Sequence, residues 1–326
     1  MRMSRTICFV AAVLGSAPVV AQPSASKDLP AREELYAFPS LIVSDQQFLT
    51  GDHRGKPITL TAELSLPQGK GRFPVVVLMH GSQGIGGNIQ YWKRHFNETG
   101  FATLVIDSMS GRGLTGVATN QALIGRLNFI VDIYRSLDIL AQHPRIDPGH
   151  VALMGFSRGG QAALYAATER FQSMWNSSNV QFAAYIPFYP DCATSYRADT
   201  ELVKRPVRIF HGANDNYNPA AACRKFVARL RQSRADVELT EYPDAYHLFD
   251  NPLASTPARP AVNEQSTREC AIREEEGGTL INQSTYAQFS YKDDCVKTDP
   301  LVGYSPSAAR AATAAVTSFL LAVFAK

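Results

Sequence analysis

A glycine-rich hexapeptide in the middle of the chain carries a candidate nucleophile. Residues 155–160 read Gly-Phe-Ser-Arg-Gly-Gly and directly follow the apolar run 151–154. A G-x-S-x-G pattern between a strand and a helix is typical of a nucleophile elbow, in which a strained backbone presents the serine hydroxyl. The helical pattern of residues 161–171 would place free N–H groups and positive dipole beside a developing oxyanion. We therefore expect Ser157 to be a nucleophile, with a structural glycine turn as the alternative.

A serine nucleophile needs a general base and an acid that orients the base. Two of the seven histidines follow Ser157 in the chain, His211 and His247. His211 ends an apolar run and is expected to be structural, whereas His247 lies in a later loop and is expected to be the base. Asp215 lies just beyond a strand end, where the active sites of open α/β sheets gather, and is expected to be the orienting acid. The alternatives are a turn role for Asp215 and three competing acids, Asp191, Asp199 and Asp244.

The developing oxyanion would need two backbone N–H donors. One should come from Arg158, the residue after the nucleophile. The other should come from the loop 80–86, His-Gly-Ser-Gln-Gly-Ile-Gly, where we expect Ser82, with Gln83 as the near alternative. This loop lacks the G-K-[ST] and G-x-G-x-x-G patterns of phosphate-binding loops.

Two arginines near these groups are candidate substrate contacts. Arg158 follows the nucleophile, and Arg112 lies in a loop after a central strand. A guanidinium in either place could bind a substrate carboxylate through two hydrogen bonds, although a salt bridge to a nearby acid is the competing interpretation. Gln83 and Tyr246 are further candidate substrate contacts.

The elements that must position these residues follow from the hydropathy pattern. Continuous apolar runs suit parallel strands, because crossover helices cover both faces of such a sheet. The runs are 74–79, 103–106, 151–154, 182–189, 207–210 and 237–242. Helical patterns cover 89–99, 121–142, 161–171, 220–232 and the C-terminal segment. The alternation predicts an α/β fold with a mostly parallel, doubly wound sheet and helices on both faces.

Residues 41–326 are expected to form a single domain. Residues 59–66 alternate in the manner of an antiparallel edge strand, and no large cap domain fits between the runs 182–189 and 207–210. The segment 251–304 exceeds what the fold needs and is expected to be an excursion that borders the site. The C-terminal helical pattern is amphipathic, which favours a packing helix over a membrane anchor.

The first 21 residues have the pattern of a secretory signal peptide. Arg2 and Arg5 precede a short apolar run that ends in small residues before Gln22. Cleavage after Ala21 would lower the net charge from +3 to +1, since two arginines and no acid are removed. Residues 22–40, rich in Pro, Ser and Ala, are expected to form a flexible arm. We therefore expect an exported protein without stable membrane insertion, with periplasm and extracellular space both open.

Composition narrows the class of protein. With 326 residues, 45% hydrophobic and 19% charged, the chain resembles an ordinary globular protein. The small net charge of +3 and the absence of a basic stripe argue against nucleic acid as a partner. The sequence sets no expectation for the oligomeric state.

Four cysteines remain once Cys8 leaves with the signal peptide. An even number in an exported chain indicates disulfides, and four cysteines allow three pairings. We expect the sequence-local pairing, Cys192–Cys223 and Cys270–Cys295, because each pair brackets one irregular segment. A zinc site is the competing interpretation, but the close C-x₂₋₄-C spacing is missing, and we expect no metal.

Taken together, the motifs resemble the dienelactone hydrolase family of α/β-hydrolases. The resemblance runs from about Leu60 to the C-terminus and rests on the segments 80–82, 107–108, 143–148, 155–160, 211–215 and 246–249. It implies the α/β-hydrolase fold, a Ser157–His247–Asp215 triad and hydrolysis of a small ester or lactone without a cofactor. Dienelactone hydrolases use a cysteine where this chain has Ser157, which favours a carboxylesterase. A serine peptidase or amidase with the same triad and a non-catalytic exported binding protein are the rival functions.

Overall fold

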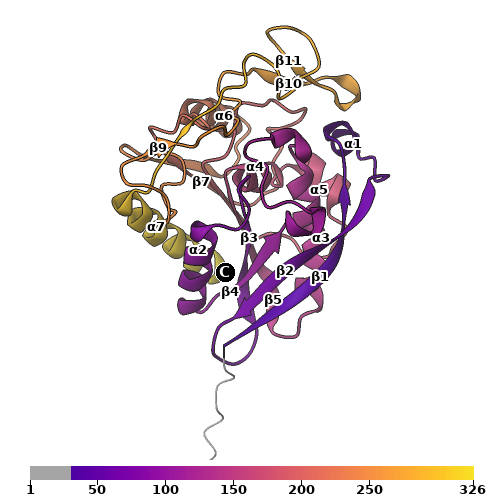
Figure 1. Cartoon of the computed structure of the whole chain (residues 1–326). Coiled ribbons are helices and arrows are strands. Elements are labelled where there is room, and N and C mark those ends of the chain that lie inside the picture. The colour runs from indigo at the N-terminus through magenta and orange to yellow at the C-terminus, as the bar shows by residue number, and fades with distance from the viewer. Residues whose placement is uncertain (1–30) are drawn as a thin grey trace, which may run out of the picture.

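A computed structural model describes residues 31–326 of the chain; the expected signal peptide, residues 1–21, lies outside this range. An eight-stranded sheet runs through the molecule in the order β1-β2-β4-β3-β5-β6-β7-β8 (Figure 1). Its strands are β1 (Arg32–Ile42), β2 (Lys56–Leu66), β3 (Phe73–Met79), β4 (Ala102–Asp107), β5 (Ile146–Phe156), β6 (Ala184–Phe188), β7 (Val207–Gly212) and β8 (Val237–Tyr242). Strands β3 to β8 are mutually parallel, which confirms the predicted α/β class and the α/β-hydrolase fold.

The N-terminal edge of the sheet corrects two expectations. Strand β2 is antiparallel as predicted, but it is not the edge, because β1 pairs with it from Arg32↔Leu66 to Ile42↔Lys56. Residues 32–40 therefore belong to a strand and not to a flexible arm, and residues 22–30 of the expected arm lie outside the described range. Pro39 made these residues resemble a loop in the sequence. An edge strand nevertheless tolerates proline, which lacks a backbone N–H.

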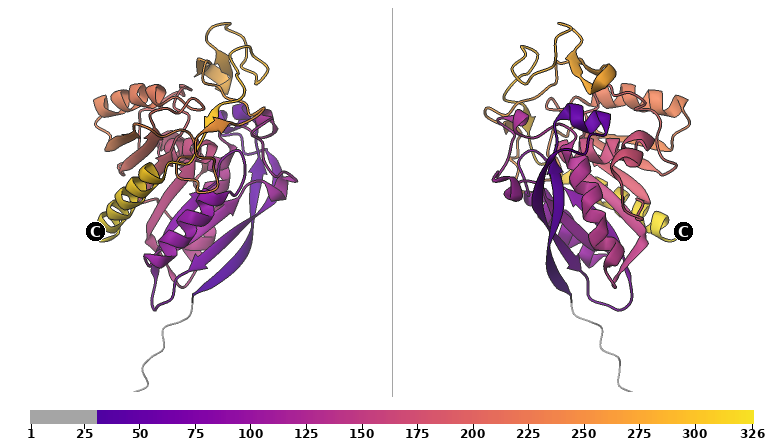
Figure 2. Two further views of the ribbon diagram at one scale, coloured as in Figure 1. Left: turned by 60° about the vertical axis from the view of Figure 1, so that its left-hand side comes forward. Right: turned by 90° about the vertical axis from the view of Figure 1, so that its right-hand side faces the viewer.

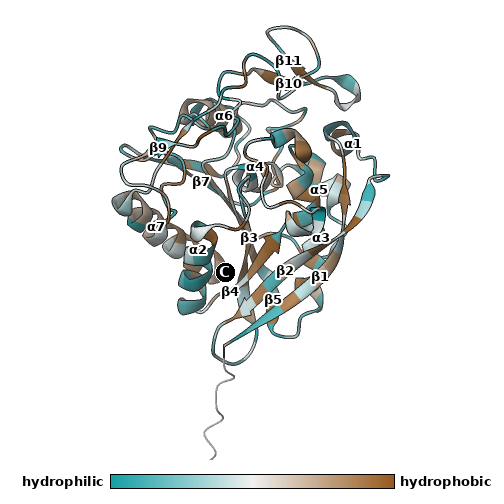
Figure 3. Ribbon diagram, viewed as in Figure 1, coloured by the Kyte–Doolittle hydropathy of each residue, from teal (hydrophilic) through white to brown (hydrophobic). Residues whose placement is uncertain are grey.

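Helices cover both faces of the sheet (Figure 2). Their bounds are α1 (Asp45–Thr50), α2 (Gly87–Glu98), α3 (Asn128–Gln142), α4 (Arg158–Tyr165), α5 (Glu169–Trp175), α6 (Ala220–Gln232) and α7 (Pro306–Phe324). Alternate residues of β3 enter two separate cores: Val75 and Val77 pack with α3 to α6, whereas Val76 and Leu78 pack with α2 and α7. This alternation is the period of two that a strand imposes, and Figure 3 shows the strands of the interior as mainly hydrophobic.

Two predicted helices are interrupted. The pattern over residues 121–142 becomes a 3₁₀ turn, η2 (Gln121–Leu123), followed by α3. The pattern over residues 161–171 becomes α4 and α5, because the Thr168 side chain accepts from the backbone N–H of Phe171 and begins a new helix.

The C-terminal helix α7 packs on the sheet through one face. Its 19 residues are long and apolar enough to cross a membrane by length and composition alone. Ala308, Ala312, Val316 and Leu320 nevertheless lie buried in the core that contains α2. This packing is what the amphipathic pattern predicts.

Residues 251–304, which we call the excursion, run from the side of the molecule near α7 to its upper end (Figure 1). Regular structure in the excursion is limited to short pieces: β9 (Arg259–Pro260), β10 (Ile272–Glu274), η3 (Glu276–Gly278), β11 (Leu280–Asn282) and β12 (Leu301–Val302). Strand β10 pairs with β11, and β12 pairs with β9. Side-chain contacts and a disulfide must therefore supply much of its order.

Two disulfides join the cysteines in the sequence-local manner. Cys192 is bonded to Cys223 and Cys270 to Cys295, with Cα atoms 4.9 Å apart in each pair. All four thiols are used, which removes the zinc alternative for these residues. Because disulfides persist in oxidising surroundings, the two bonds indicate a compartment other than the cytoplasm.

Candidate active site

Ser157 occupies a strained turn between β5 and α4. Its backbone angles are φ 55° and ψ −115°, and its N–H donates to the carbonyl oxygen of Phe188 at 3.0 Å. A side chain at Gly155 would collide with Gly159, and one at Gly159 would collide with the carbonyl of Met79. The glycines flanking the serine are therefore required by the close approach of three chain segments.

A hydrogen-bonded chain of three side chains begins at this serine. His247 Nε2 lies 2.9 Å from Ser157 Oγ, and His247 Nδ1 lies 2.7 Å from Asp215 Oδ2. All three residues are buried, although Ser157 keeps 8% of its surface exposed. In the tautomer that satisfies both contacts, Nδ1 donates to the carboxylate and Nε2 accepts from the serine hydroxyl. The arrangement can draw a proton from Ser157 and stabilise the resulting imidazolium.

The surroundings of Asp215 favour the ionised form of its carboxyl group. Its Oδ1 accepts from the backbone N–H groups of Tyr217, at 2.8 Å, and Asn218, at 2.9 Å. Burial alone would raise the pKa of Asp215, but His247 and the histidine at 211 together hold this pKa well below its usual range. The carboxylate is therefore negatively charged at any pH at which the fold is expected to work.

His211 has the structural role that its position suggests. Its Nε2 lies 2.7 Å from the carbonyl oxygen of Asn218 and 3.3 Å from Asp215 Oδ2. It thereby fixes the loop that carries Asp215. His80 is likewise buried, its Nε2 accepts from the backbone N–H of Ser108, and burial lowers its pKa.

Two tyrosine rings pack against the imidazole of His247. The rings of Tyr189 and Tyr217 both have their centroids 4.5 Å from that of His247. The backbone oxygen of His247 also accepts from the N–H of Gly303, at the far end of the excursion, at 2.9 Å. The ring therefore packs against both tyrosines, and its position is also fixed through its own main chain.

A buried carboxylate lies behind Tyr189. Asp250 accepts from the Tyr189 hydroxyl at 2.6 Å and from the Trp92 indole N–H at 2.8 Å. Desolvation raises the pKa of Asp250 to about 6, in opposition to these two hydrogen bonds. No cationic side chain pairs with this carboxylate in an ion pair within residues 31–326.

The expected oxyanion donors lie on either side of Ser157. Arg158 begins α4, and Ser82 lies in the loop after β3, where a side chain at Gly81 would come within 3.2 Å of Ser157 Cβ. Within the described residues, neither the Ser82 nor the Arg158 backbone N–H donates to another protein group. Both donors are therefore available to an incoming oxygen. Gln83 instead donates from its side chain to Glu264 Oε1 at 2.6 Å.

Of the expected substrate contacts, Arg112 is corrected outright. Its guanidinium is buried and forms two 2.9 Å hydrogen bonds with Asp132, a pair that holds the loop after β4 against α3. Tyr246 is absent from the lining of both pockets described below, so the structure does not place it at the site. Arg158 does border the site, but its guanidinium donates to the carbonyl oxygens of Gln121 and Ile124.

The two buried or half-buried competing acids are paired with arginines, and the third is exposed. Asp191 lies 2.5 Å from Arg126, and Asp199 lies 2.8 Å from Arg229. Asp244 is exposed to solvent. Asp215 is thus the acid that the structure brings to His247.

Two pockets meet at Ser157. Both are open to solvent: the first, which we call the polar lobe, spans about 340 Å³ and the second, which we call the apolar lobe, about 400 Å³, open solvent included. The polar lobe is lined mainly by hydrogen-bonding side chains, among them Arg126, Arg158, Gln161, Gln265, Thr267 and Tyr291. The apolar lobe is lined by His247 and by Gly81, Gly86, Phe156, Leu248 and Glu264.

Several of these residues could not be identified from the sequence. Gln121 accepts from both Ser82 and Arg158 through its side-chain oxygen and so links the two expected oxyanion donors. Tyr217 follows Asp215 by two residues and was the one detectable by position. Tyr291 and Glu264 come from the excursion, in which no motif indicates a contact with the site.

Comparisons with known proteins identify the family and the fold. The family model described as "Dienelactone hydrolase family" matches residues 60–273. A curated relative from Bradyrhizobium sp, named "Probable 2-oxo-3-(5-oxofuran-2-ylidene)propanoate lactonase", is 24% identical over 203 residues, which cover 58% of this chain and 78% of the relative.

Solved structures show the same fold. A dienelactone hydrolase-like promiscuous phosphotriesterase, P91, from metagenomic libraries superposes with a TM-score of 0.55 at 17% identity, covering 89% of this chain and 98% of its own. A structure titled "m3DLH" superposes with a TM-score of 0.53 at 23% identity, covering 69% of this chain and 86% of its own.

Proposed function

The chain belongs to the dienelactone hydrolase family and is a hydrolase that acts on ester bonds, and from this we propose that it works through an acyl-enzyme on Ser157. His247 is the general base and Asp215 the orienting acid. The hydrogen-bonded chain from Ser157 Oγ through His247 to Asp215 carries the proposal. The substrates are small carboxylic esters or lactones.

The reaction begins when Ser157 Oγ attacks the acyl carbon and its proton passes to His247 Nε2. The tetrahedral oxyanion accepts hydrogen bonds from the backbone N–H groups of Ser82 and Arg158, each worth about 3 kcal/mol. Asp215 stabilises the imidazolium. The alcohol then leaves with the proton from His247, and a water molecule activated by the same histidine releases the acid.

Two features of the chain support export from the cytoplasm. The charged and apolar pattern of residues 1–21 and the two disulfides favour a cleaved signal peptide and a periplasmic or secreted protein. N-terminal sequencing of the mature protein tests this part of the proposal: a chain that begins near Gln22 supports it, and a retained Met1 contradicts it.

A fluorophosphonate probe with peptide mapping tests the chemistry. We expect one labelled peptide that contains Ser157, and no labelling in Ser157→Ala. Folded protein that is not labelled and does not hydrolyse esters would favour the non-catalytic binding protein. Comparable turnover of matched amides would favour the peptidase or amidase.

A further inference from the structure

The two lobes assign the two halves of an ester. His247 lines the apolar lobe and is absent from the lining of the polar lobe, whereas Ser157 borders both. The leaving alcohol takes its proton from His247, so its oxygen must lie within hydrogen-bond reach of Nε2. The alcohol half therefore occupies the apolar lobe, and the acyl half extends from Ser157 into the polar lobe.

The walls of the polar lobe suit an acyl chain that carries oxygen. Most of the side chains that line the lobe end in hydrogen-bonding groups, and the Tyr291 hydroxyl accepts from Arg126 NH1 at 2.8 Å, which leaves its own proton for another acceptor. Leaving a buried polar group unpaired is costly, so an acyl chain with an acceptor fits this lobe better than a hydrocarbon chain.

The guanidiniums of this lobe are already engaged by the protein. Arg126 is paired with Asp191 at 2.5 Å, and Arg158 donates to the carbonyl oxygens of Gln121 and Ile124 at 2.9 Å. A substrate carboxylate would have to compete with these partners. The lobe is thus suited to a neutral oxygen function such as a hydroxyl group.

The apolar lobe exposes a larger share of carbon. Phe156, Leu248 and the glycines of the loop after β3 form its apolar wall, and its polar members include Gln83, Asn88, Asn251 and Glu264. Two exposed apolar side chains lie beside this wall. Ile85 stands between two lining glycines in the sequence, and Leu253 packs close to Gly87. An unbranched hydrocarbon alcohol would bury apolar surface along this path.

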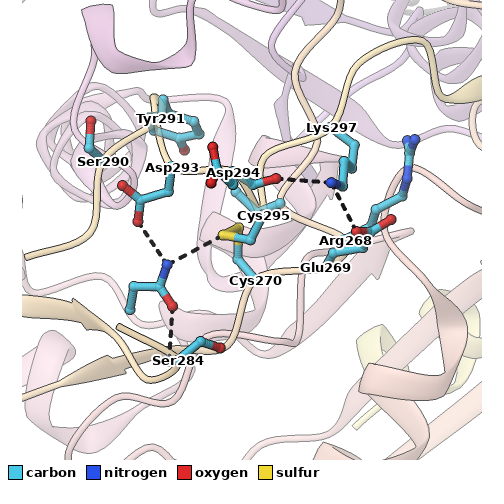
Figure 4. The surroundings of a disulfide bond; sticks show 12 residues. Arg268, Glu269, Cys270, Ser284, Ser290, Tyr291, Asp293, Asp294, Cys295 and Lys297 are labelled. Atoms are coloured by element: carbon cyan, nitrogen blue, oxygen red, sulfur yellow. Dashed lines mark hydrogen bonds and ion pairs between the residues drawn. A yellow bond between two sulfur atoms is a disulfide. The ribbon is translucent and has the colours of Figure 1, made fainter. Parts of the chain in front are cut away.

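We propose that the enzyme selects esters in which a short hydroxylated acid is joined to an apolar alcohol, with Tyr291 as a residue that determines acyl specificity. This inference rests on the acyl-enzyme at Ser157. Tyr291 uses its oxygen to accept from Arg126, which leaves the hydroxyl proton to be donated to the substrate. Its backbone lies in the turn that leads to the Cys270–Cys295 disulfide (Figure 4).

A pair of isomeric esters tests the assignment of the lobes. Hexyl 3-hydroxybutanoate has its hydroxyl group on the acid, and 3-hydroxybutyl hexanoate has it on the alcohol. We expect kcat/KM to favour the first by about tenfold or more, since a site with buried polar groups rejects partners that leave them unpaired. Equal values, or a preference for the second ester, would overturn the assignment.

Tyr291→Phe tests the residue. We expect this variant to lose about three- to tenfold of kcat/KM on hexyl 3-hydroxybutanoate and little on hexyl butanoate, since one hydrogen bond is removed. Tyr286→Phe is the matched control, because Tyr286 belongs to the same excursion but is 77% exposed. Equal losses on both esters, or the same loss in the control, would contradict the specific role of Tyr291.

The outcomes separate this inference from the proposed function. Labelling at Ser157 with hydrolysis of both isomers at the same rate overturns the substrate preference alone. Absence of both labelling and hydrolysis overturns the acyl-enzyme itself. A hexyl hemisuccinate preferred over hexyl 3-hydroxybutanoate would show that the lobe binds a carboxylate instead of a neutral oxygen.

Discussion

The reacting groups and the outer wall of the pocket come from two regions that are built differently. Ser157, Asp215 and the oxyanion loop follow the carboxyl ends of β5, β7 and β3, so the sheet fixes their separation. Glu264, Gln265, Thr267 and Tyr291 come from the excursion, where regular structure is limited to short strands and one turn.

The difference separates chemistry from selection. A sheet ladder holds groups through many backbone hydrogen bonds and changes little when one side chain is replaced. The excursion is held by a disulfide (Figure 4) and by side-chain contacts such as Asn282 Nδ2 to Asp293 Oδ2 at 2.9 Å. Substitutions in the strand-end region should therefore remove activity, whereas those in the excursion should change which substrate is used.

The largest effect is expected from the strand-end region. Ser157→Ala should lower kcat by a factor on the order of 10⁵ or more, because no acyl-enzyme can form. Steady-state ester hydrolysis measures it. Ser82→Ala is the matched control: it keeps the backbone N–H and should cost about tenfold or less. Activity that survives in Ser157→Ala would break the comparison at its base.

Asp215→Asn should have the next largest effect. The amide cannot hold the His247 tautomer or stabilise its imidazolium, so kcat should fall about 10⁴-fold. Asp244→Asn, at an exposed acid upstream of His247, should leave kcat unchanged. If the two variants lost equal activity, the orienting acid would not be Asp215.

The third prediction concerns the excursion. Replacing Cys270 and Cys295 by serine opens a loop with a sequence separation of 25, which should cost up to about 3–4 kcal/mol of stability in the chain-entropy model. KM should rise more than kcat falls, since the pocket wall loosens while Ser157 and His247 stay in place. Denaturant unfolding and initial rates measure the two effects.

The Cys192–Cys223 bond provides the control for that prediction. It has a similar separation of 31 and joins α6 to the segment after β6. Its removal should lower stability by a comparable amount and change KM less. A larger rise in KM than for the Cys270–Cys295 variant would show that the wall does not depend on the excursion.

The smallest effect is expected from Asp250→Asn. Because burial raises the pKa of Asp250 from 3.8 to about 6, its protonated form stabilises the fold below about pH 4, and this contribution is lost as the pH rises through 6. At about 1.4 kcal/mol per pKa unit, the asparagine variant should gain up to about 3 kcal/mol relative to wild type between pH 4 and pH 8.

Urea unfolding of both proteins at several pH values measures this gain. Asp244→Asn, at an exposed carboxylate, is the control variant in the same series. A stability difference that is independent of pH, or of opposite sign, would contradict the prediction.

The sequence could indicate the parts of the site that strands position. An apolar run that ends in a motif locates Ser157 and Asp215 without knowledge of the packing, since parallel strands end at one edge of a sheet. His247 was predicted because it follows Ser157 and Asp215 in the chain. The disulfide pairing was predicted because each cysteine pair brackets one irregular segment.

Side-chain partners over long separations were beyond such reasoning. Arg112 pairs with Asp132 of α3, and no local pattern reveals this pair. Strand β1 contains Pro39, a residue type that is typical of loops. Tyr291 reaches Arg126 across 165 positions of the chain. Periodicity reports which face of an element is apolar, but it does not report which polar group meets another.

The excursion begins and ends at the same place, and this has a consequence for how the family can diversify. The chain leaves the loop that carries His247 at Asn251. It returns at Gly303 and Ser305, whose backbone N–H groups donate to the carbonyl oxygens of His247 and Phe249, both at 2.9 Å. Because loop-closure entropy grows only slowly with length, changes of length at the exposed tip around Tyr286 would leave these two ends and the base in position. Contacts such as Ser266 Oγ to the carbonyl oxygen of Tyr217 and Arg170 to Glu274 join the rest of the segment to the catalytic frame, so new pocket walls can arise at the tip while that frame stays unchanged.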